Sequence, residues 1–254
     1  MLKLENVSAG YGGADVIRNI SMEVKENLSI IGPNGCGKTT LLKTIANILK
    51  FKGRMEFSGR AFNSMKRKEI SLNIAMLSQQ PSIYFSYSVY DTVMMGRYLH
   101  LKKRITGNPV KEDKEIVIQS LEAVNLLAEK DKDITHLSGG QLQRVFLARV
   151  LAQQPRIILL DEPTNHLDLK CQIEIIEYLK IWSQKENRAV IGVLHDINQA
   201  IRLSERLIVM KDGLIQADGC ANEIISSGLL DRVYEINVSE YMKSSLEKWT
   251  FPMI

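Results

Sequence analysis

The sequence predicts an α/β fold: a parallel sheet with a β-rich flank and an inserted helical segment. Two short apolar runs, "RIILL" and "AVIGVL", are typical of parallel strands that are buried on both faces. A third run, "LSII", passes through a glycine-rich turn into "LLKTIANIL", which is the pattern of a strand followed by a helix. Between about residues 85 and 150, apolar residues recur at spacings of three and four, which predicts helices.

The elements follow one another in a clear order along the chain. Near the N-terminus, the alternating segments "MLKLENVSAGYG" and "GRMEFSGRAF" predict antiparallel strands that end in glycine turns. After the helical segment, the strands "RIILL" and "AVIGVLH" alternate with the helices "CQIEIIEYLKIWSQ" and "INQAIRLSE". The segment "RLIVMKDGLIQADG" predicts a hairpin that turns at its Asp-Gly pair. We therefore expect a single domain, residues 1–254, with a core and β-rich part in 1–84 and 151–254 and a helical part in about 85–150.

The composition is that of a soluble globular protein, because 45% of the 254 residues are hydrophobic and 24% are charged. The net charge of +4 is mild, so no nucleic acid partner is expected, although an anionic membrane surface nearby is not excluded. The apolar runs are too short to span a bilayer, and the N-terminal segment lacks the apolar core of a signal peptide. Cys36, Cys171 and Cys220 have no paired spacing, which favours a reducing cytoplasm without a disulfide framework.

The stretch "IIGPNGCGKTTLLK" predicts a phosphate-binding loop, because Gly32, Gly37, Lys38 and Thr39 fit the pattern G-x-x-x-x-G-K-[ST]. Glycine is needed where backbone N–H groups close around phosphate oxygens, since side chains would block the approach. Lys38 is expected to reach the β- and γ-phosphates, and the Thr39 hydroxyl to ligate Mg²⁺. The residues of this loop predicted to bind the nucleotide are Gly32, Pro33, Asn34, Gly35, Cys36, Gly37, Lys38, Thr39 and Thr40.

Two acids follow the buried strand in "RIILLDEPTNHLD". Ligands collect at the carboxyl ends of parallel strands, so Asp161 and Glu162 would face the phosphates. Asp161 could hold Mg²⁺ through its water shell, and Glu162 could orient or deprotonate the attacking water. The alternative is that both are surface acids that open a turn before Pro163, but the phosphate-binding loop elsewhere in the chain favours the catalytic interpretation.

The stretch "THLSGGQLQRV" predicts a second helix start suited to phosphate. Ser138 would cap a helix that begins near Gly140, and the glycines leave the backbone N–H groups accessible. One nucleotide has a single γ-phosphate, so a head-to-tail dimer is the natural way for both helix starts to reach it. The spacing by itself does not distinguish this arrangement from a plain capped helix.

With these motifs in this order, the chain resembles the ATP-binding cassette (ABC) ATPases over nearly its full length. The order is Tyr11, "GPNGCGKTT", Gln79, "LSGGQ", "ILLDEPTNHLD" and His195. The resemblance implies a P-loop NTPase core, an antiparallel β-subdomain and an inserted α-helical subdomain. It also implies ATP and Mg²⁺ as cofactors and ATP hydrolysis as the activity, with Lys38, Glu162 and His195 as the catalytic residues.

The resemblance assigns further residues to the nucleotide. Tyr11 resembles the aromatic residue that stacks on adenine, and a β-turn aromatic is its alternative role. Gln79, preferred over its neighbour Gln80, resembles the glutamine that touches Mg²⁺ and senses a membrane partner. Asp168 is similar to the aspartate at the dimer contact, and His195 to the histidine that contacts the γ-phosphate. The signature residues expected at the nucleotide are Ser138, Gly139, Gly140 and Gln141. His136 and His166 are interpreted as structural.

Finer features resemble one group within the family. "FSYSVYDTVMMGRYLH", "QRVFLARVLAQ" and "LHDINQA" are similar to ATPases that drive the uptake of iron–siderophore chelates, haem or cobalamin. This similarity implies a homodimer with ATP at its interface, separate integral membrane permease subunits, and a peripheral position on the cytoplasmic face of the cell membrane. Two alternatives remain: the ATPase of another ABC importer or exporter, and a soluble ABC ATPase such as that of iron–sulfur assembly.

Overall fold

Two β-sheets form the framework of the chain, whose computed structural model describes residues 1–78, 86–101, 108–164 and 167–247. The strands are β1 (Leu2–Ala9), β2 (Ile17–Val24), β3 (Leu28–Ile31), β4 (Phe51–Phe57), β5 (Arg60–Ala61), β6 (Ile74–Leu77), β7 (Ile157–Asp161), β8 (Ala189–Val193), β9 (Arg206–Lys211) and β10 (Leu214–Cys220). The antiparallel sheet has the order β2-β1-β4-β5, and the larger sheet has the order β10-β9-β3-β8-β7-β6. From β9 to β6 the larger sheet is parallel, and β10 is its antiparallel edge.

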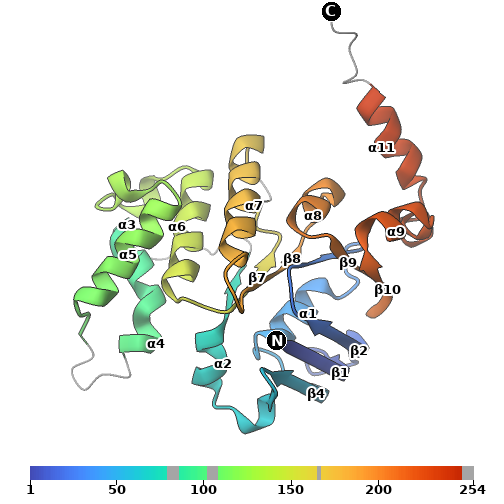
Figure 1. Cartoon of the computed structure of the whole chain (residues 1–254), viewed down its shortest axis with the longest axis horizontal. Coiled ribbons are helices and arrows are strands. Elements are labelled where there is room, and N and C mark those ends of the chain that lie inside the picture. Colours follow the sequence, from blue (N-terminus) through green and yellow to red (C-terminus); the bar gives the residue numbers. More distant parts are fainter. Residues whose placement is uncertain (79–85, 102–107, 165–166, 248–254) are drawn as a thin grey trace, which may run out of the picture.

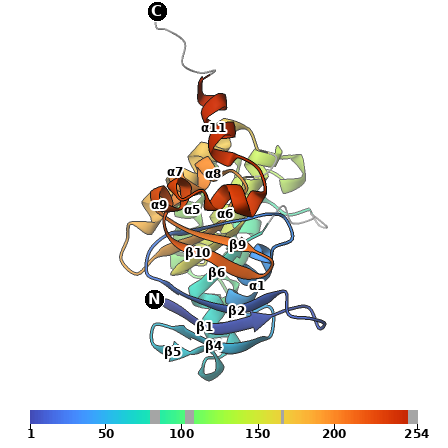
Figure 2. The ribbon, with the colours of Figure 1, turned by 90° about the vertical axis from the view of Figure 1, so that its right-hand side faces the viewer.

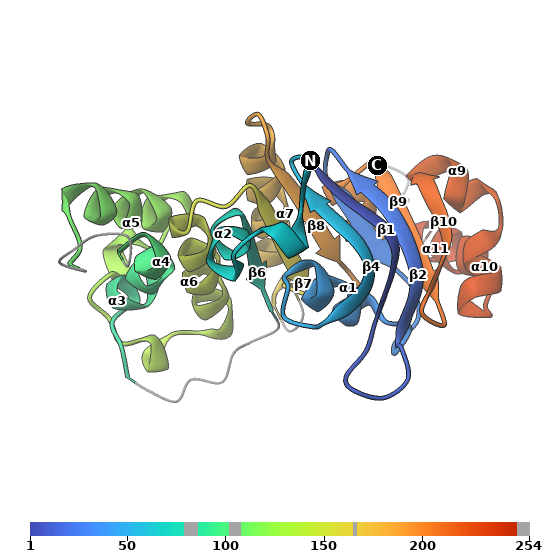
Figure 3. The same ribbon diagram turned by 90° about the horizontal axis from the view of Figure 1, so that it is seen from below.

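Helices cover the larger sheet on one face, and the antiparallel sheet with α1 covers the other (Figures 1 and 2). The helices are α1 (Lys38–Ile45), α2 (Arg67–Asn73), α3 (Val89–Met94), α4 (Tyr98–Leu101), α5 (Lys111–Ala123), α6 (Gly139–Ala152), α7 (Leu169–Ser183), α8 (Ile197–Leu203), α9 (Ala221–Ser226), α10 (Leu229–Tyr234) and α11 (Val238–Glu247). Short 3-10 turns occupy Phe62–Ser64, Met95–Arg97, Leu127–Glu129 and Ile134–His136. In Figure 3, α1 lies between β4 and β7, at the junction of the two sheets.

The side chains of the parallel strands alternate between two hydrophobic cores. On β7, Ile157 and Leu159 belong to the core shared with the antiparallel sheet and α1. Ile158 and Leu160 belong to the core beneath the helices. Every residue of β7 is buried, because successive side chains of a strand point to opposite faces and both faces are covered. This two-sided burial is the reason why "RIILL" is a continuous apolar run, and it confirms the predicted α/β class.

Helices α3 to α6 gather at one end of the molecule, and we call this group the helical lobe, Val89–Ala152 (Figures 1 and 3). A buried ion pair holds it together, since Arg97 Nε lies 3.0 Å from Asp113 Oδ1. The same guanidinium donates to the carbonyl of Ala152 at 2.9 Å, which ties the start of the lobe to its end. The helices predicted between about residues 85 and 150 are present, while the division of the chain into subdomains stays a prediction.

The hairpin predicted at the Asp-Gly pair is confirmed. Lys211 pairs with Leu214, and Asp212 and Gly213 have positive φ angles of 51° and 76°, as a two-residue hairpin turn requires. The predicted strand "LSII" is β3, and the predicted helix after it is α1. Within the described ranges, none of the helices has both the length and the apolar character that a bilayer crossing needs.

Candidate nucleotide-binding site

The loop between β3 and α1 is packed so tightly that two of its positions require glycine. A Cβ atom on Gly32 would lie 2.1 Å from the carbonyl oxygen of Met210, and one on Gly37 would lie 2.8 Å from Cγ2 of Ile17. Gly37 also has φ 103°, which a residue with a Cβ adopts only with strain. The backbone of this loop is therefore fixed against β9 and β2, which holds its N–H groups in place at the start of α1.

Lys38 places its charge inside this loop. Its Nζ atom donates to the carbonyl oxygens of Gly32 and Pro33 at 2.7 and 2.8 Å, and the side chain is buried. The N-cap position of α1, Gly37, makes no side-chain capping hydrogen bond. An uncapped helix start next to a buried cation is an arrangement that attracts a phosphate group.

Thr39 and Asp161 bring two oxygen ligands together. The Thr39 hydroxyl donates to Asp161 Oδ1 at 2.8 Å, which joins the first turn of α1 to the end of β7. Burial raises the pKa of the Asp161 carboxyl, and the hydrogen bond from Thr39 offsets part of that rise. A hydroxyl and a carboxylate fit Mg²⁺, which keeps several waters and takes its remaining ligands from substrate phosphates. In the parts of the chain that are described, no three or more His, Cys, Asp or Glu side chains form a metal cluster.

Glu162 and His195 meet because β7 and β8 are neighbours that end side by side. Glu162 Oε1 lies 2.5 Å from His195 Nε2, and the Glu162 N–H donates to the carbonyl of Val193 at 3.0 Å. Glu162 has φ 53°, an uncommon value for a residue with a Cβ, and such strain of about 1–3 kcal/mol clusters at functional sites. The Glu162 carboxylate and the His195 ring are therefore in direct contact at the ends of these two strands.

These groups surround one cavity of about 300 Å³. The lining residues are Val16, Asn34, Gly35, Gly37, Lys38, Thr39, Thr40, Glu162 and His195. Tyr11 lies near it, since the Thr40 hydroxyl contacts its Oη at 3.5 Å and Lys43 Nζ lies 5.6 Å from its ring centre. Tyr11 is 60% exposed, so it is accessible beside the cavity. Val16 was not predicted, because an aliphatic residue in the β1–β2 connection has no chemical signature in the sequence.

The thiol of Cys36 does not line this cavity. Together with Pro33, Cys36 lines a second cavity bounded by Lys211 and Tyr234. Burial raises the pKa of the thiol, and the Lys38 ammonium opposes that rise. Any contact of Cys36 with a nucleotide in the first cavity would therefore come from its backbone.

The predicted signature residues lie apart from the loop of their own chain. Ser138 is the N-cap of α6: its Oγ accepts the Gln141 N–H at 3.3 Å, and Gln141 Oε1 accepts the Ser138 N–H at 3.1 Å. Ser138 and Gly139 are exposed. A Cβ on Gly140 would lie 3.0 Å from Cys171 Sγ, so this glycine allows α6 to approach α7 closely. Within the described residues, none of this group lines the cavity around Lys38.

The last four residues singled out in the sequence lie outside the cavity around Lys38 or outside the described residues. Asp168 is the N-cap of α7, where its Oδ1 accepts the Cys171 N–H at 2.8 Å. That hydrogen bond is the main reason why the pKa of the Asp168 carboxyl is lowered. His136 ends a 3-10 turn that leads to α6. Gln79 and His166 lie outside the described residues.

Comparison with known proteins identifies the family. Residues 17–165 match the family model described as ABC transporter. The chain belongs to the ABC transporter family. The match includes the loop around Lys38 and the signature segment, and it confirms the resemblance drawn from the order of the motifs. This ABC cassette is therefore an ATP-binding protein and an ATPase.

Relatives of this ABC cassette match it over most of its length. It is 36% identical over 236 residues to the ferric enterobactin transport ATP-binding protein FepC of Escherichia coli (strain K12), covering 92% of this chain and 86% of FepC. It is 34% identical over 239 residues to the iron(3+)-hydroxamate import ATP-binding protein FhuC of Bacillus subtilis (strain 168), covering 93% and 88%. A solved dimeric structure of the ATP-binding cassette MJ0796, in a post-hydrolysis state with ADP and Pi, is similar with a TM-score of 0.75 and 31% identity. That match covers 87% of this chain and 99% of the other.

Proposed function

We propose that this chain is the ATP-hydrolysing subunit of a membrane importer for a metal chelate of the iron–siderophore, haem or cobalamin type. The observation that carries this proposal is its similarity, over more than nine-tenths of the chain, to FepC and FhuC, whose names assign them to ferric enterobactin transport and iron(3+)-hydroxamate import. The chain would act with integral membrane permease subunits and lie peripherally on the cytoplasmic face of the cell membrane.

The geometry of the cavity supports the following roles. Tyr11 stacks on the adenine, and Lys38 with the uncapped start of α1 binds the phosphates. Thr39 and Asp161 would hold Mg²⁺, and the ion when bound neutralises charge on the phosphate oxygens. Glu162 takes up the proton of the attacking water.

His195 is close enough to Glu162 to orient its carboxylate and to contact the terminal phosphate. The donors for the terminal phosphate come from two chains in this proposal. Ser138, Gly139, Gly140 and Gln141 do not line the cavity of their own chain, and Ser138 and Gly139 are exposed, so they suit the nucleotide of a partner copy. The dimeric MJ0796 cassette supports a homodimer with ATP at its interface.

In that dimer, Asp168 at the start of α7 lies at the contact between copies, and Gln79 reports on the permease. Both assignments come from the family pattern.

Recovery of the tagged chain from detergent-solubilised membranes tests the proposal. We expect an integral membrane protein to co-purify, and cells that lack the chain to lose uptake of one radiolabelled cargo among ferric siderophore, haem and cobalamin. Wild-type chain restores uptake and Glu162→Gln does not. Co-purification with a soluble iron–sulfur assembly protein, with uptake of all three cargoes unchanged, would contradict the importer assignment.

A further inference from the structure

A cavity of about 460 Å³, which we call the basic cavity, lies at the amino ends of the parallel strands. Two of its lining residues, Asn27 and Arg188, directly precede β3 and β8, whereas the P-loop (residues 32–39) and His195 follow the same two strands. These strands are four and five residues long, so about 13–17 Å of sheet separate the basic cavity from the nucleotide cavity. The basic cavity is therefore separate from the site described above.

Hydrogen bonds around Asn27 join the three segments that form the walls of the basic cavity. Asn27 Nδ2 donates to Ser183 Oγ at the end of α7 at 2.7 Å, and Asn27 Oδ1 accepts the Val190 N–H at 2.9 Å. The Ser204 hydroxyl, which follows α8, donates to the Asn27 carbonyl at 2.7 Å. The shape of the cavity is thus fixed by its framework rather than by long surface side chains.

The basic cavity is strongly positive. The cations that line it are Lys25, Lys180, Lys185, Arg188 and Arg206. Two carboxylates, Glu26 and Glu205, also line it, which leaves an excess of three positive charges. This excess is nearly as large as the net charge of +4 of the whole chain. Such a concentration of one sign of charge in a concave site attracts anions.

Two of the five cations already have carboxylate partners. Arg206 donates to both carboxylate oxygens of Asp218 at 2.8 Å, and Lys25 Nζ lies 3.3 Å from Glu23 Oε2. The other three form no ion pair with a carboxylate of the described residues, and they are Lys180, Lys185 and Arg188. These three charges are available to a ligand.

The guanidinium group of Arg188 is held in place by an aromatic ring. Its central carbon lies 4.8 Å from the ring centre of Trp182, which is buried. Arg188 and Lys180 are both half-buried, so water screens their charges less than it screens those of exposed side chains. A guanidinium group that is supported on its face can still donate two N–H groups from its edge to one phosphate.

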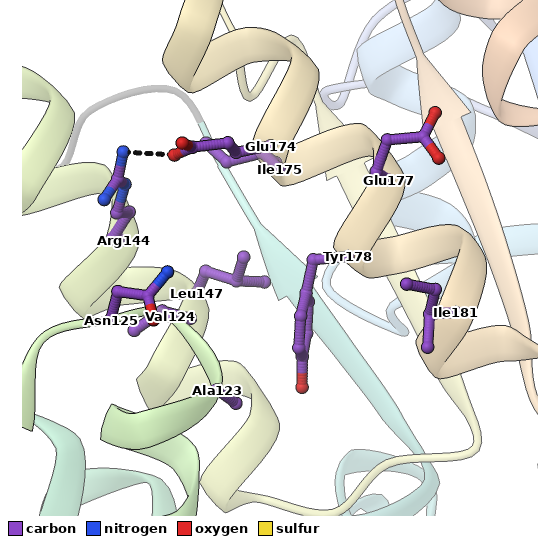
Figure 4. Close-up of a pocket in the computed structure, with 10 residues that line it drawn as sticks. All are labelled: Ala123, Val124, Asn125, Arg144, Leu147, Glu174, Ile175, Glu177, Tyr178 and Ile181. Atoms are coloured by element: carbon purple, nitrogen blue, oxygen red, sulfur yellow. Dashed lines mark hydrogen bonds and ion pairs between the residues drawn. The ribbon is translucent and has the colours of Figure 1, made fainter.

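The pocket between α6 and α7 shows the opposite arrangement (Figure 4). Most residues that line it are aliphatic or aromatic, and its arginine, Arg144, lies 2.5 Å from Glu174 Oε2. The guanidinium group of Arg144 therefore already has an anionic partner, whereas that of Arg188 does not.

We propose that the basic cavity binds a free small molecule that carries two or more phosphate groups. Two phosphate groups carry about three to four negative charges near neutral pH, which matches the excess of three positive charges. The volume exceeds the 300 Å³ of the nucleotide cavity and lies in the range of small-molecule sites. Lys180 also lies in the last turn of α7, where it complements the helix dipole, but Lys185 and Arg188 lie beyond the end of that helix. This inference does not depend on the proposed importer function.

Calorimetric titration with inorganic pyrophosphate tests the inference. The chain carries Lys38→Ala and the buffer lacks Mg²⁺, so that the P-loop contributes little to binding. We expect one pyrophosphate to bind per chain. In the cavity variant, which combines Lys180→Gln, Lys185→Gln and Arg188→Gln, Kd should rise at least about 10-fold, as expected for the loss of three partly exposed charge pairs.

A matched control removes the same number of charges at the start of α2, outside the basic cavity. It combines Lys66→Gln, Arg67→Gln and Lys68→Gln. Its Kd should stay within about 2-fold, because salt screens remote surface charges. Equal weakening in the cavity variant and the control would overturn the inference, as would the absence of pyrophosphate binding to the chain with Lys38→Ala alone.

Lys185→Glu provides a second measurement that leaves the framework unchanged. Lys185 is exposed, and neither the hydrogen bonds around Asn27 nor the contact between Arg188 and Trp182 involves it. We expect the Kd for pyrophosphate to rise about 3-fold or more. With Lys38 intact, this variant should hydrolyse ATP at the normal rate, because Lys185 does not line the nucleotide cavity. An unchanged Kd for pyrophosphate would overturn the inference.

A phosphate-bearing lipid headgroup presents the same chemistry as a free phosphate compound. Sedimentation with phosphatidylglycerol vesicles distinguishes the two sources, and we expect the cavity variant and the control to sediment equally. Vesicle binding that requires Lys180, Lys185 and Arg188, in a chain that does not bind pyrophosphate, would overturn the assignment of a free anion.

Discussion

Two helices of this chain have glycine at their N-terminal ends, as the N-cap of α1 and as the first residue of α6, but their first N–H groups are satisfied in opposite ways. Helix α1 follows Gly37 with no side-chain cap, and its start lies inside a cavity with Lys38. Helix α6 follows Ser138, whose hydroxyl and the Gln141 amide cap each other's backbone, and its start is exposed. The uncapped start of α1 leaves N–H groups free to bind a ligand in the cavity of the same chain. The capped and exposed start of α6 is instead a rigid surface that another molecule can contact.

Replacing Glu162, the proposed base in the cavity at the start of α1, should have the largest effect. We expect Glu162→Gln to lower kcat by about 10²–10⁴-fold, because the amide cannot take a proton from water, while ATP still binds. An ATP-dependent dimer should then persist in size-exclusion chromatography. Glu177→Gln, which changes a carboxylate paired with Arg202 outside the cavity, is the control and should turn over normally. Normal turnover by Glu162→Gln would remove this residue from the mechanism.

Placing a cation at the α6 start should have the next largest effect. Ser138→Arg fills the exposed helix start, and we expect hydrolysis to fall by about 10²-fold, as for the loss of a preorganised donor. The affinity of the monomer for ATP should hardly change, since Ser138 does not line the cavity of its own chain.

Mixed variants then sharpen the comparison. In a head-to-tail dimer, a chain with Ser138→Arg and a chain with Lys38→Ala form one site in which both the loop and the signature helix are unmodified. Mixing the two inactive proteins should therefore restore part of the activity. A mixture that stays inactive would argue that α1 and α6 do not meet across a dimer.

Removing the cap alone should have a smaller effect on stability. Ser138→Ala is expected to cost about 0.5–2 kcal/mol of unfolding free energy, and Ser88→Ala, at the equivalent cap of α3, a similar amount. Only Ser138→Ala should also lower the ATPase rate. Thermal melting measures the role of Ser138 as a helix cap, and steady-state hydrolysis measures its role at the nucleotide. If both variants hydrolyse ATP at the same rate, Ser138 acts only as a helix cap.

The smallest expected effect is electrostatic. Because the pKa of Asp161 is raised in the folded protein, its ionised form costs folding free energy at pH values above that pKa. The cost disappears as the pH falls below the pKa of the unfolded chain, where the carboxyl is protonated in both states. Asp161→Asn should therefore raise Tm by a few degrees at pH 8, measured without nucleotide, and by progressively less toward pH 3. A gain that is constant with pH would exclude charge as its cause.

Local patterns predicted a large part of the fold. The strands of the parallel sheet were predictable because burial on both faces requires continuous apolar runs such as that of β7. The hairpin at Asp212 was predictable because its backbone needs positive φ angles. Local patterns could not predict which cavity a side chain lines, because each cavity is formed by segments that are far apart in the chain. Examples are Val16 in the first cavity and Cys36 and Tyr234 in the second.

The sequence by itself determined that one loop needs glycine, lysine and threonine in a set order, because phosphate binding by a backbone requires those residue types. It also determined that Ser138 caps a helix, since a cap depends on residues only three positions apart. Only the tertiary structure decided that Glu162 meets His195, because the adjacent parallel strands β7 and β8 bring their ends together from distant parts of the chain. It also decided that Thr39 meets Asp161, because the first turn of α1 lies against the end of β7. It alone also decided that the signature helix lies apart from its own P-loop, since the packing of the helical lobe sets that position.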